Sequence, residues 1–82
     1  MNKEILIEKK VFAERLKARR ELCKLTQKEL AAILQISERN YQYYESQKKP
    51  LMPSLYYLLA ICERLDISID YLLNRTENPK LK

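Results

Sequence analysis

The stretch TQKELAAILQISERNYQYYE, residues 26–45, constrains this chain more than any other, because it predicts two short helices joined by a tight turn. Thr26 and Glu29 have the T-x-x-E spacing of a capping box, so a helix should begin immediately after Thr26. Leu30 and Leu34 lie four residues apart and give this helix one apolar face. The first helix can therefore support a second one.

The second helix of this stretch should cover residues 38–46. Ser37 is a favourable N-cap, and the first helical residue places a carboxylate at the positive end of the helix dipole. Tyr41 and Tyr44 lie three apart and share a face that can pack on the first helix. The opposite face then presents Glu38, Arg39, Asn40, Gln42 and Tyr43 to solvent. A short helix with this polar outer face, supported by another helix, is suited to place side chains in the DNA major groove.

At these residues the chain resembles the Cro/repressor helix-turn-helix family, also described as XRE-type or lambda-repressor-like. The matching positions are Thr26, Gln27, Leu30, Ala31, Leu34, Ile36, Ser37, Tyr41, Tyr44 and Glu45. The likeness covers about residues 11–74, because residues 11–23 resemble the family's first helix and residues 53–73 its last two. The resemblance implies an all-α, compact five-helix domain with the helix-turn-helix at its centre.

The 82 residues are expected to form one domain. We expect residues 1–10 to be a partly ordered lead-in, residues 11–74 to be the helix-turn-helix DNA-binding domain, and residues 75–82 to be a polar tail that frays. Ile5 and Ile7 leave three roles open for the lead-in: an extension of the first helix, a flexible arm or a dimer contact. Pro53 suits the first position of the fourth helix.

Four positions at which the family usually has glycine carry other residues, namely Lys24, Gln35, Gln47 and Asp66. Each lies at an expected helix end or turn, where a left-handed backbone is common. A residue other than glycine in that conformation costs about 1 kcal/mol. We therefore expect local changes in these turns and the same overall fold.

The net charge of +5 is distributed unevenly along the chain. Residues 1–24 carry eight Lys or Arg against four Glu, residues 25–49 carry four against three, and residues 50–82 carry four against four acidic residues. The excess positive charge thus lies beside the predicted helix-turn-helix. This asymmetry favours a polyanion as the partner.

Several other classes of protein are not expected. Two cysteines and no histidine make a metal site improbable on chemical grounds, no cofactor is predicted, and Cys23 and Cys62 fit small core residues in a reducing compartment. Without histidine, a glycine-rich phosphate loop or paired carboxylates in an evident pocket, we do not expect an enzyme. No stretch approaches the roughly 18 apolar residues of a membrane helix and no signal peptide is evident, so a cytoplasmic protein without membrane contact is expected.

The candidate DNA contacts divide into those that read bases and those that position the protein on phosphates. The predicted base contacts are Gln27, Glu38, Arg39, Asn40, Gln42 and Tyr43, and the predicted phosphate contacts are Arg15, Arg19, Lys28, Ser37, Lys48 and Lys49. Arg39 can bind guanine O6 and N7, and Asn40 or Gln42 can pair with adenine. Glu38 can accept from cytosine N4, whereas Gln27 can contact a phosphate or a base edge.

The resemblance also implies one structural pair. Arg20 and Glu45 stand where the family tends to place Arg and Glu. We expect them to form a partly buried ion pair that joins the first helix to the end of the third, and removing one member of such a pair is costly.

The leading interpretation is a sequence-specific regulator of transcription that binds double-stranded DNA. The resemblance implies a repressor that acts as a homodimer on an inverted repeat, with residues 38–46 in the major groove. Candidate dimer contacts are Tyr56, Tyr57, Tyr71 and Leu73. The alternative is an antitoxin-like interaction module that binds a partner protein and regulates its own operon; a neighbouring toxin gene would favour it. RNA binding is less favoured, because the aromatic residues mostly lie at core spacing.

Overall fold

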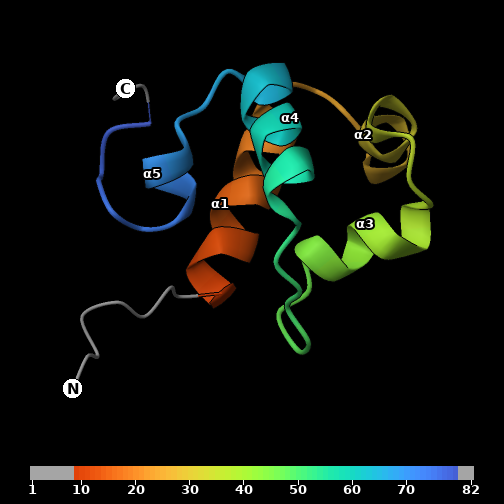
Figure 1. The fold of residues 1–82 in the computed structure, drawn as a ribbon, viewed down its shortest axis with the longest axis horizontal. Coiled ribbons are helices and arrows are strands. Elements are labelled where there is room, and N and C mark those ends of the chain that lie inside the picture. Colours follow the sequence, from red (N-terminus) through yellow and green to blue (C-terminus); the bar gives the residue numbers. More distant parts are fainter. Residues whose placement is uncertain (1–8, 80–82) are drawn as a thin grey trace.

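The computed structural model describes residues 9–79, and this part of the chain folds into five helices with no strand. The helices are α1 (Lys9–Leu22), α2 (Gln27–Leu34), α3 (Glu38–Tyr44), α4 (Leu55–Leu65) and α5 (Ile69–Leu72). Figure 1 shows α2 and α3 on one side of α1 and α4, and α5 with the last described residues on the other side. The predicted all-α, five-helix architecture is confirmed.

The short helices begin at side-chain caps that the sequence provides. At α2, the hydroxyl of Thr26 accepts from the backbone N–H of Glu29 at 3.0 Å, and the Glu29 carboxylate accepts from the N–H of Thr26 at 2.8 Å. Ser37 accepts from the N–H of Asn40 at 3.0 Å at the start of α3, and Ser68 caps α5 in the same way. Each cap contributes about 1 kcal/mol, which matters for helices this short.

Several helix bounds differ from the predictions by one or two residues. Helix α1 begins at Lys9 instead of residue 11 and ends at Leu22 instead of residue 23, and α3 ends at Tyr44 instead of residue 46. Helix α4 begins at Leu55 and not at Pro53, because Ser54 has the extended backbone of an N-cap (φ −65°, ψ 165°). Pro53 precedes this cap and is buried.

The two ends of the chain are only partly described. Residues 1–8, which carry most of the expected lead-in, lie outside the described residues, as do the last three residues of the expected tail. The described part of the tail lies against α1. Arg15 Nη1 donates to the carbonyl of Thr76 at 3.0 Å, and Arg15 Nη2 donates to the Glu77 carboxylate at 3.1 Å. The polar composition of the tail did not reveal these contacts.

Four described residues have a left-handed backbone without being glycine: Lys24 (φ 61°), Gln35 (φ 61°), Asp66 (φ 55°) and Asn74 (φ 63°). Three of them are positions where we expected this conformation. The expectation for Gln47 was wrong, and Asn74 was missed. Asn74 follows α5 and suits the position, because asparagine tolerates this conformation better than most residues.

A single core joins the helices. Its largest fully buried side chains are Tyr41, Phe12, Leu16, Leu30, Ile61, Leu65 and Leu72. Burying a side chain of this size contributes about 1.5–3 kcal/mol. Cys23 and Cys62 are half-buried against this core, and burial raises the pKa of the Cys62 thiol to about 11. Within residues 9–79, no helix is long and apolar enough to cross a membrane.

Candidate DNA-binding surface

The outer face of α3 is open to solvent while its inner face is anchored in the core. All five residues predicted for the outer face are exposed: Glu38, Arg39, Asn40, Gln42 and Tyr43. On the inner face Tyr41 is fully buried and Tyr44 is 7% exposed, with their rings edge-to-face at a centroid distance of 5.7 Å. Ser37 uses its oxygen as a cap, so its hydroxyl hydrogen remains able to donate to a phosphate.

The loop after α3 holds Lys48 and Lys49 beside this face. The hydroxyl of Ser46 accepts from the backbone N–H of Lys48 at 3.2 Å and of Lys49 at 2.9 Å. The N–H of Leu51 then donates to the carbonyl of Tyr43 at 3.1 Å, which returns the loop to α3. Both lysines are exposed. Sequence reasoning missed the role of Ser46, although serine at the start of a polar turn is a known signal for this arrangement.

The first turn of α2 supplies two more predicted contacts, Gln27 and Lys28. Lys28 is exposed, whereas Gln27 is half-buried. Gln27 Nε2 donates to Glu45 Oε1 at 3.0 Å, so the start of α2 is tied to the end of α3. The structure therefore brings Gln27 together with the two residues that we expected to form the ion pair.

A buried ion pair lies behind this surface. Arg20 Nε donates to Glu45 Oε2 at 2.7 Å and Arg20 Nη2 donates to Glu45 Oε1 at 3.1 Å, which is the bidentate geometry of a strong pair. Each residue is only 7% exposed, and the hydrogen bond to Glu45 raises the pKa of Arg20 above its ordinary value. Arg20 Nη1 also donates to the carbonyl of Leu25 at 2.7 Å. The pair that the family resemblance implied is present, and it fixes α1 to the end of α3.

Tyr41 adds a third partner to the same carboxylate. Its hydroxyl donates to Glu45 Oε2 at 2.5 Å. Burial of the phenol, together with this hydrogen bond, raises the pKa of Tyr41 well above its ordinary value, so the hydroxyl stays protonated and able to donate. Sequence analysis assigned Tyr41 only a packing role. The spacing of four residues between Tyr41 and Glu45 on one helix was the signal that could have revealed the contact.

Two of the predicted phosphate contacts, Arg15 and Arg19, lie away from α3. Arg15 Nη1 donates to the carbonyl of Tyr71 at 2.6 Å, and its guanidinium lies 4.0 Å from the centroid of the Tyr71 ring. Arg19 donates to the carbonyls of Leu65 and Asp66 at 2.9 and 3.0 Å. Leu65 and Tyr71 lie in the last turns of α4 and α5, and Asp66 is the C-cap of α4, so the two arginines bind the ends of these helices. Arg15 thus reaches α5, which lies across α1 and α4 from α3 (Figure 1), and Arg19 binds the C-terminal end of α4. Both guanidinium groups are engaged by protein carbonyls and not by the surface around α3.

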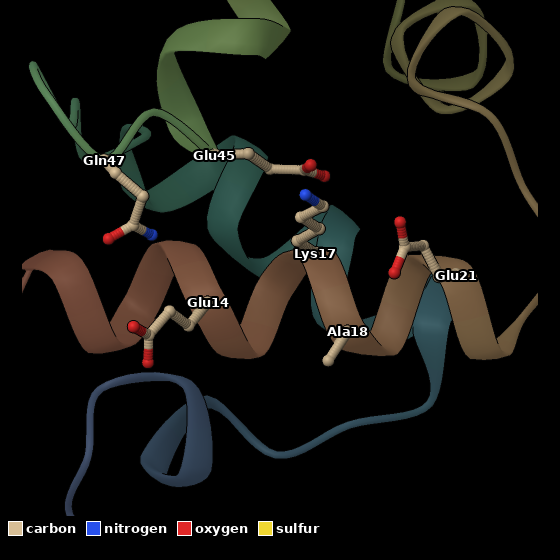
Figure 2. Close-up of a pocket in the computed structure, with 6 residues that line it drawn as sticks. All are labelled: Glu14, Lys17, Ala18, Glu21, Glu45 and Gln47. Atoms are coloured by element: carbon tan, nitrogen blue, oxygen red, sulfur yellow. The ribbon is translucent and has the colours of Figure 1, made fainter.

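A shallow groove runs between α1 and the segment that follows α3 (Figure 2). It is lined by Glu14, Lys17, Ala18, Glu21, Glu45 and Gln47. Glu45 is paired with Arg20, so the groove presents Glu14 and Glu21 against Lys17, and this balance does not favour a polyanion. Among residues 9–79 no cluster of His, Cys, Asp or Glu is suited to hold a metal ion.

Together, the supported α3 face and the buried ion pair behind it define a helix-turn-helix domain, a class of DNA-binding domain. The family model described as helix-turn-helix matches residues 16–72, and the chain belongs to this family. The XRE-type resemblance predicted from the sequence is confirmed.

A relative supports the same assignment. The HTH-type transcriptional regulator YobD of Bacillus subtilis (strain 168) is 33% identical over 72 residues, which cover 88% of this chain and 62% of the relative. The chain therefore spans less than two thirds of that relative's length. No solved structure matches the chain significantly.

Proposed function

We propose that this chain is a sequence-specific regulator of transcription that binds double-stranded DNA through the outer face of α3. The observation that carries the proposal is that α3 has one exposed polar face and one buried face. Arg39 and its polar neighbours are exposed, whereas Tyr41 and Tyr44 hold the opposite side in the core. A helix presented in this way can enter the major groove without rearrangement of the domain.

Base reading is assigned to the residues of this face. Arg39 binds guanine through O6 and N7, and Asn40 or Gln42 pairs with adenine. Glu38 accepts from cytosine N4, and Tyr43 contacts a thymine methyl group or a phosphate. Phosphate contact is assigned to Lys28, Ser37, Lys48 and Lys49. Arg15 and Arg19 do not enter this proposal, because their guanidinium groups donate to protein carbonyls of α5 and of the C-terminal end of α4.

The proposed functional unit is a homodimer on an inverted repeat, and the proposed effect is repression by occupying an operator. A single domain of this class covers only one half-site, and two-fold symmetry in the protein matches symmetry in the DNA. An apolar patch formed by Ile33, Tyr56 and Leu59 supports a dimer, because Tyr56 is 74% exposed and shares one surface groove with Ile33 and another with Leu59. The other three expected dimer contacts, Tyr57, Tyr71 and Leu73, are half-buried in the domain's own packing.

The antitoxin-like alternative uses the same apolar patch, with a partner protein in place of the second copy. Sedimentation of the purified chain at tens of micromolar separates the two. A dimer that dissociates in Tyr56→Lys, and is retained in the matched control Leu22→Lys at an exposed leucine on α1, supports the homodimer. A monomer at this concentration contradicts it and favours the partner protein.

Selection of bound sequences from a random DNA pool tests the proposal. The wild type should enrich an inverted repeat, and Arg39→Ala should lose preference at one position in each half-site. Lys48→Ala should weaken all sequences alike and reduce the steepness of the salt dependence by about 0.9 in the log-log slope. Failure of the wild type to bind any duplex at low ionic strength would overturn the proposal.

A further inference from the structure

The side-chain amide of Gln27 is held in one orientation by Glu45. Gln27 Nε2 lies 3.0 Å from Glu45 Oε1. A carboxylate only accepts hydrogen bonds, so the amide nitrogen must face Glu45 and the carbonyl oxygen of Gln27 must face away from it. A glutamine on a surface without such a partner can present either its N–H groups or its carbonyl oxygen, whereas the hydrogen bond to Glu45 fixes the orientation of the Gln27 amide.

The carboxylate that makes this choice has little freedom of its own. Glu45 Oε1 accepts from Arg20 and Gln27, and Glu45 Oε2 accepts from Arg20 and Tyr41. The four acceptor positions of the carboxylate are thus filled by three neighbours. The Glu45 side chain is only 2% exposed, so it cannot turn to solvent without losing several buried hydrogen bonds. Glu45 is therefore a rigid support for the amide.

We propose that Glu45 is a positioning residue that makes Gln27 a reader of adenine in the major groove. With one N–H given to Glu45, Gln27 retains a carbonyl oxygen and one N–H. A phosphate can accept from the remaining N–H, but it leaves the carbonyl oxygen without a donor. Adenine offers a donor at N6 beside an acceptor at N7, which matches the two remaining groups of the amide. The buried ion pair thus has a second effect, since it decides what a surface residue can recognise.

This inference rests on the proposed function, and it resolves the choice that the sequence left open for Gln27 between phosphate and base. Glu45 itself does not contact DNA, because it is buried behind the surface. Its effect is exerted through Gln27. It should therefore change sequence preference and not only affinity.

The experiment compares a selected operator with copies in which single adenines are replaced by purine, which lacks the 6-amino group. The wild type should lose about tenfold in affinity at one adenine in each half-site. Gln27→Met, which cannot hydrogen-bond there, should show no loss at that adenine. In Glu45→Gln the Gln27 amide is free to turn, so the loss should shrink to about twofold or less.

Tyr41→Phe is the matched control. It removes a hydrogen bond from the other oxygen of the same carboxylate and leaves the Gln27 contact in place. It should weaken the network and keep the tenfold preference for adenine. A merely structural role for Glu45 would make Glu45→Gln and Tyr41→Phe behave alike, and that result would overturn the inference.

Two further results would also overturn it. Gln27→Met could weaken all sequences equally, which is the behaviour of a phosphate contact. In the wild type, the side-chain amide of Gln27 could exchange its hydrogens as fast as the amides of the exposed Gln42 and Gln47. This exchange is measured by NMR on the wild-type protein, so it tests the inference even if Glu45→Gln does not fold. Slower exchange at Gln27 supports the inference.

Arg39→Ala separates this inference from the proposed function. If Arg39→Ala loses preference at its own base and no adenine depends on Gln27, the inference fails and the proposed function stands. If the wild type selects no sequence, the proposed function fails.

Discussion

Arg39 on α3 and the arginines on α1 carry the same charged group but lie in opposite environments. Arg15, Arg19 and Arg20 donate to acceptors within the protein, and these contacts join α1 to α3, α4 and the C-terminal residues. Arg39 lies exposed on the outer face of α3. The difference shows that a run of positive charge on a helix does not identify a DNA-binding face. What decides is whether the fold places protein acceptors within reach of each guanidinium.

The largest expected effect is on the stability of the fold, through the buried Arg20. Arg20→Ala leaves Glu45 buried without its charge partner and should lower the free energy of unfolding by about 3–5 kcal/mol. Denaturant unfolding measures it, with Arg39→Ala as the exposed control that should change stability by less than about 0.5 kcal/mol. A loss of only a few tenths of a kcal/mol in Arg20→Ala would mean that the buried pair does not hold α1 to α3.

The next largest effect is on DNA recognition by the exposed Arg39. Arg39→Ala should remove about 1–3 kcal/mol of discrimination at one base pair in each half-site, because the bidentate contact to guanine is lost. Fluorescence anisotropy with operator variants measures this at constant salt. Equal losses for every sequence would instead make Arg39 a phosphate contact.

The buried network also predicts how stability depends on pH. The pKa of Tyr41 is raised in the folded state by burial and by its hydrogen bond to Glu45, and burial raises that of Tyr44 as well. Below pH about 10 both folded and unfolded tyrosines are protonated, so this stabilisation is fully present. Above that pH the unfolded state loses the Tyr41 proton while the folded state keeps it, so stability should fall by about 1.4 kcal/mol per pH unit from Tyr41, and Tyr44 should add to the decline.

Urea unfolding between pH 9 and pH 11 tests this expectation. Tyr41→Phe should be less stable than the wild type at pH 9 and should show a shallower decline as pH rises. Parallel curves for the two proteins would show that Tyr41 does not contribute to the pH dependence.

The smallest effect concerns the outer contacts of α1. Arg15→Ala removes donors to the carbonyls of Tyr71 and Thr76, and it should cost about 1 kcal/mol of stability because these bonds are only partly buried. Hydrogen exchange should quicken around α5, with DNA affinity unchanged. A drop in affinity together with a lower salt slope would return Arg15 to the phosphate contacts predicted from the sequence.

The comparison also shows which features the sequence could predict. Thr26 and Ser37 set the starts of α2 and α3 through contacts within four residues, so local spacing was sufficient. The inward tyrosines and the exposed face of α3 followed from helical periodicity in the same way. The roles of Arg15 and Arg19 could not be assigned from periodicity, because their acceptors are backbone carbonyls more than forty residues away in sequence.

Turn geometry was predicted only in part, for a similar reason. Lys24, Gln35 and Asp66 adopt the left-handed backbone expected at a helix end, whereas Gln47 does not. The loop that contains Gln47 is shaped by Ser46 and by the return of Leu51 to α3, and these contacts replace the turn that a glycine would allow. The loop conformation therefore depends on contacts with residues that follow the turn, and these contacts cannot be read from the turn residues alone.

The central claim is that DNA meets the outer face of α3, and titration of the chain with a selected duplex, followed by backbone amide NMR shifts, tests it most directly. The account predicts that shifts concentrate at residues 37–43, at the first turn of α2 and at residues 46–49, with small changes around Arg15 and α5. Large shifts around α5 with an unchanged α3 would contradict it.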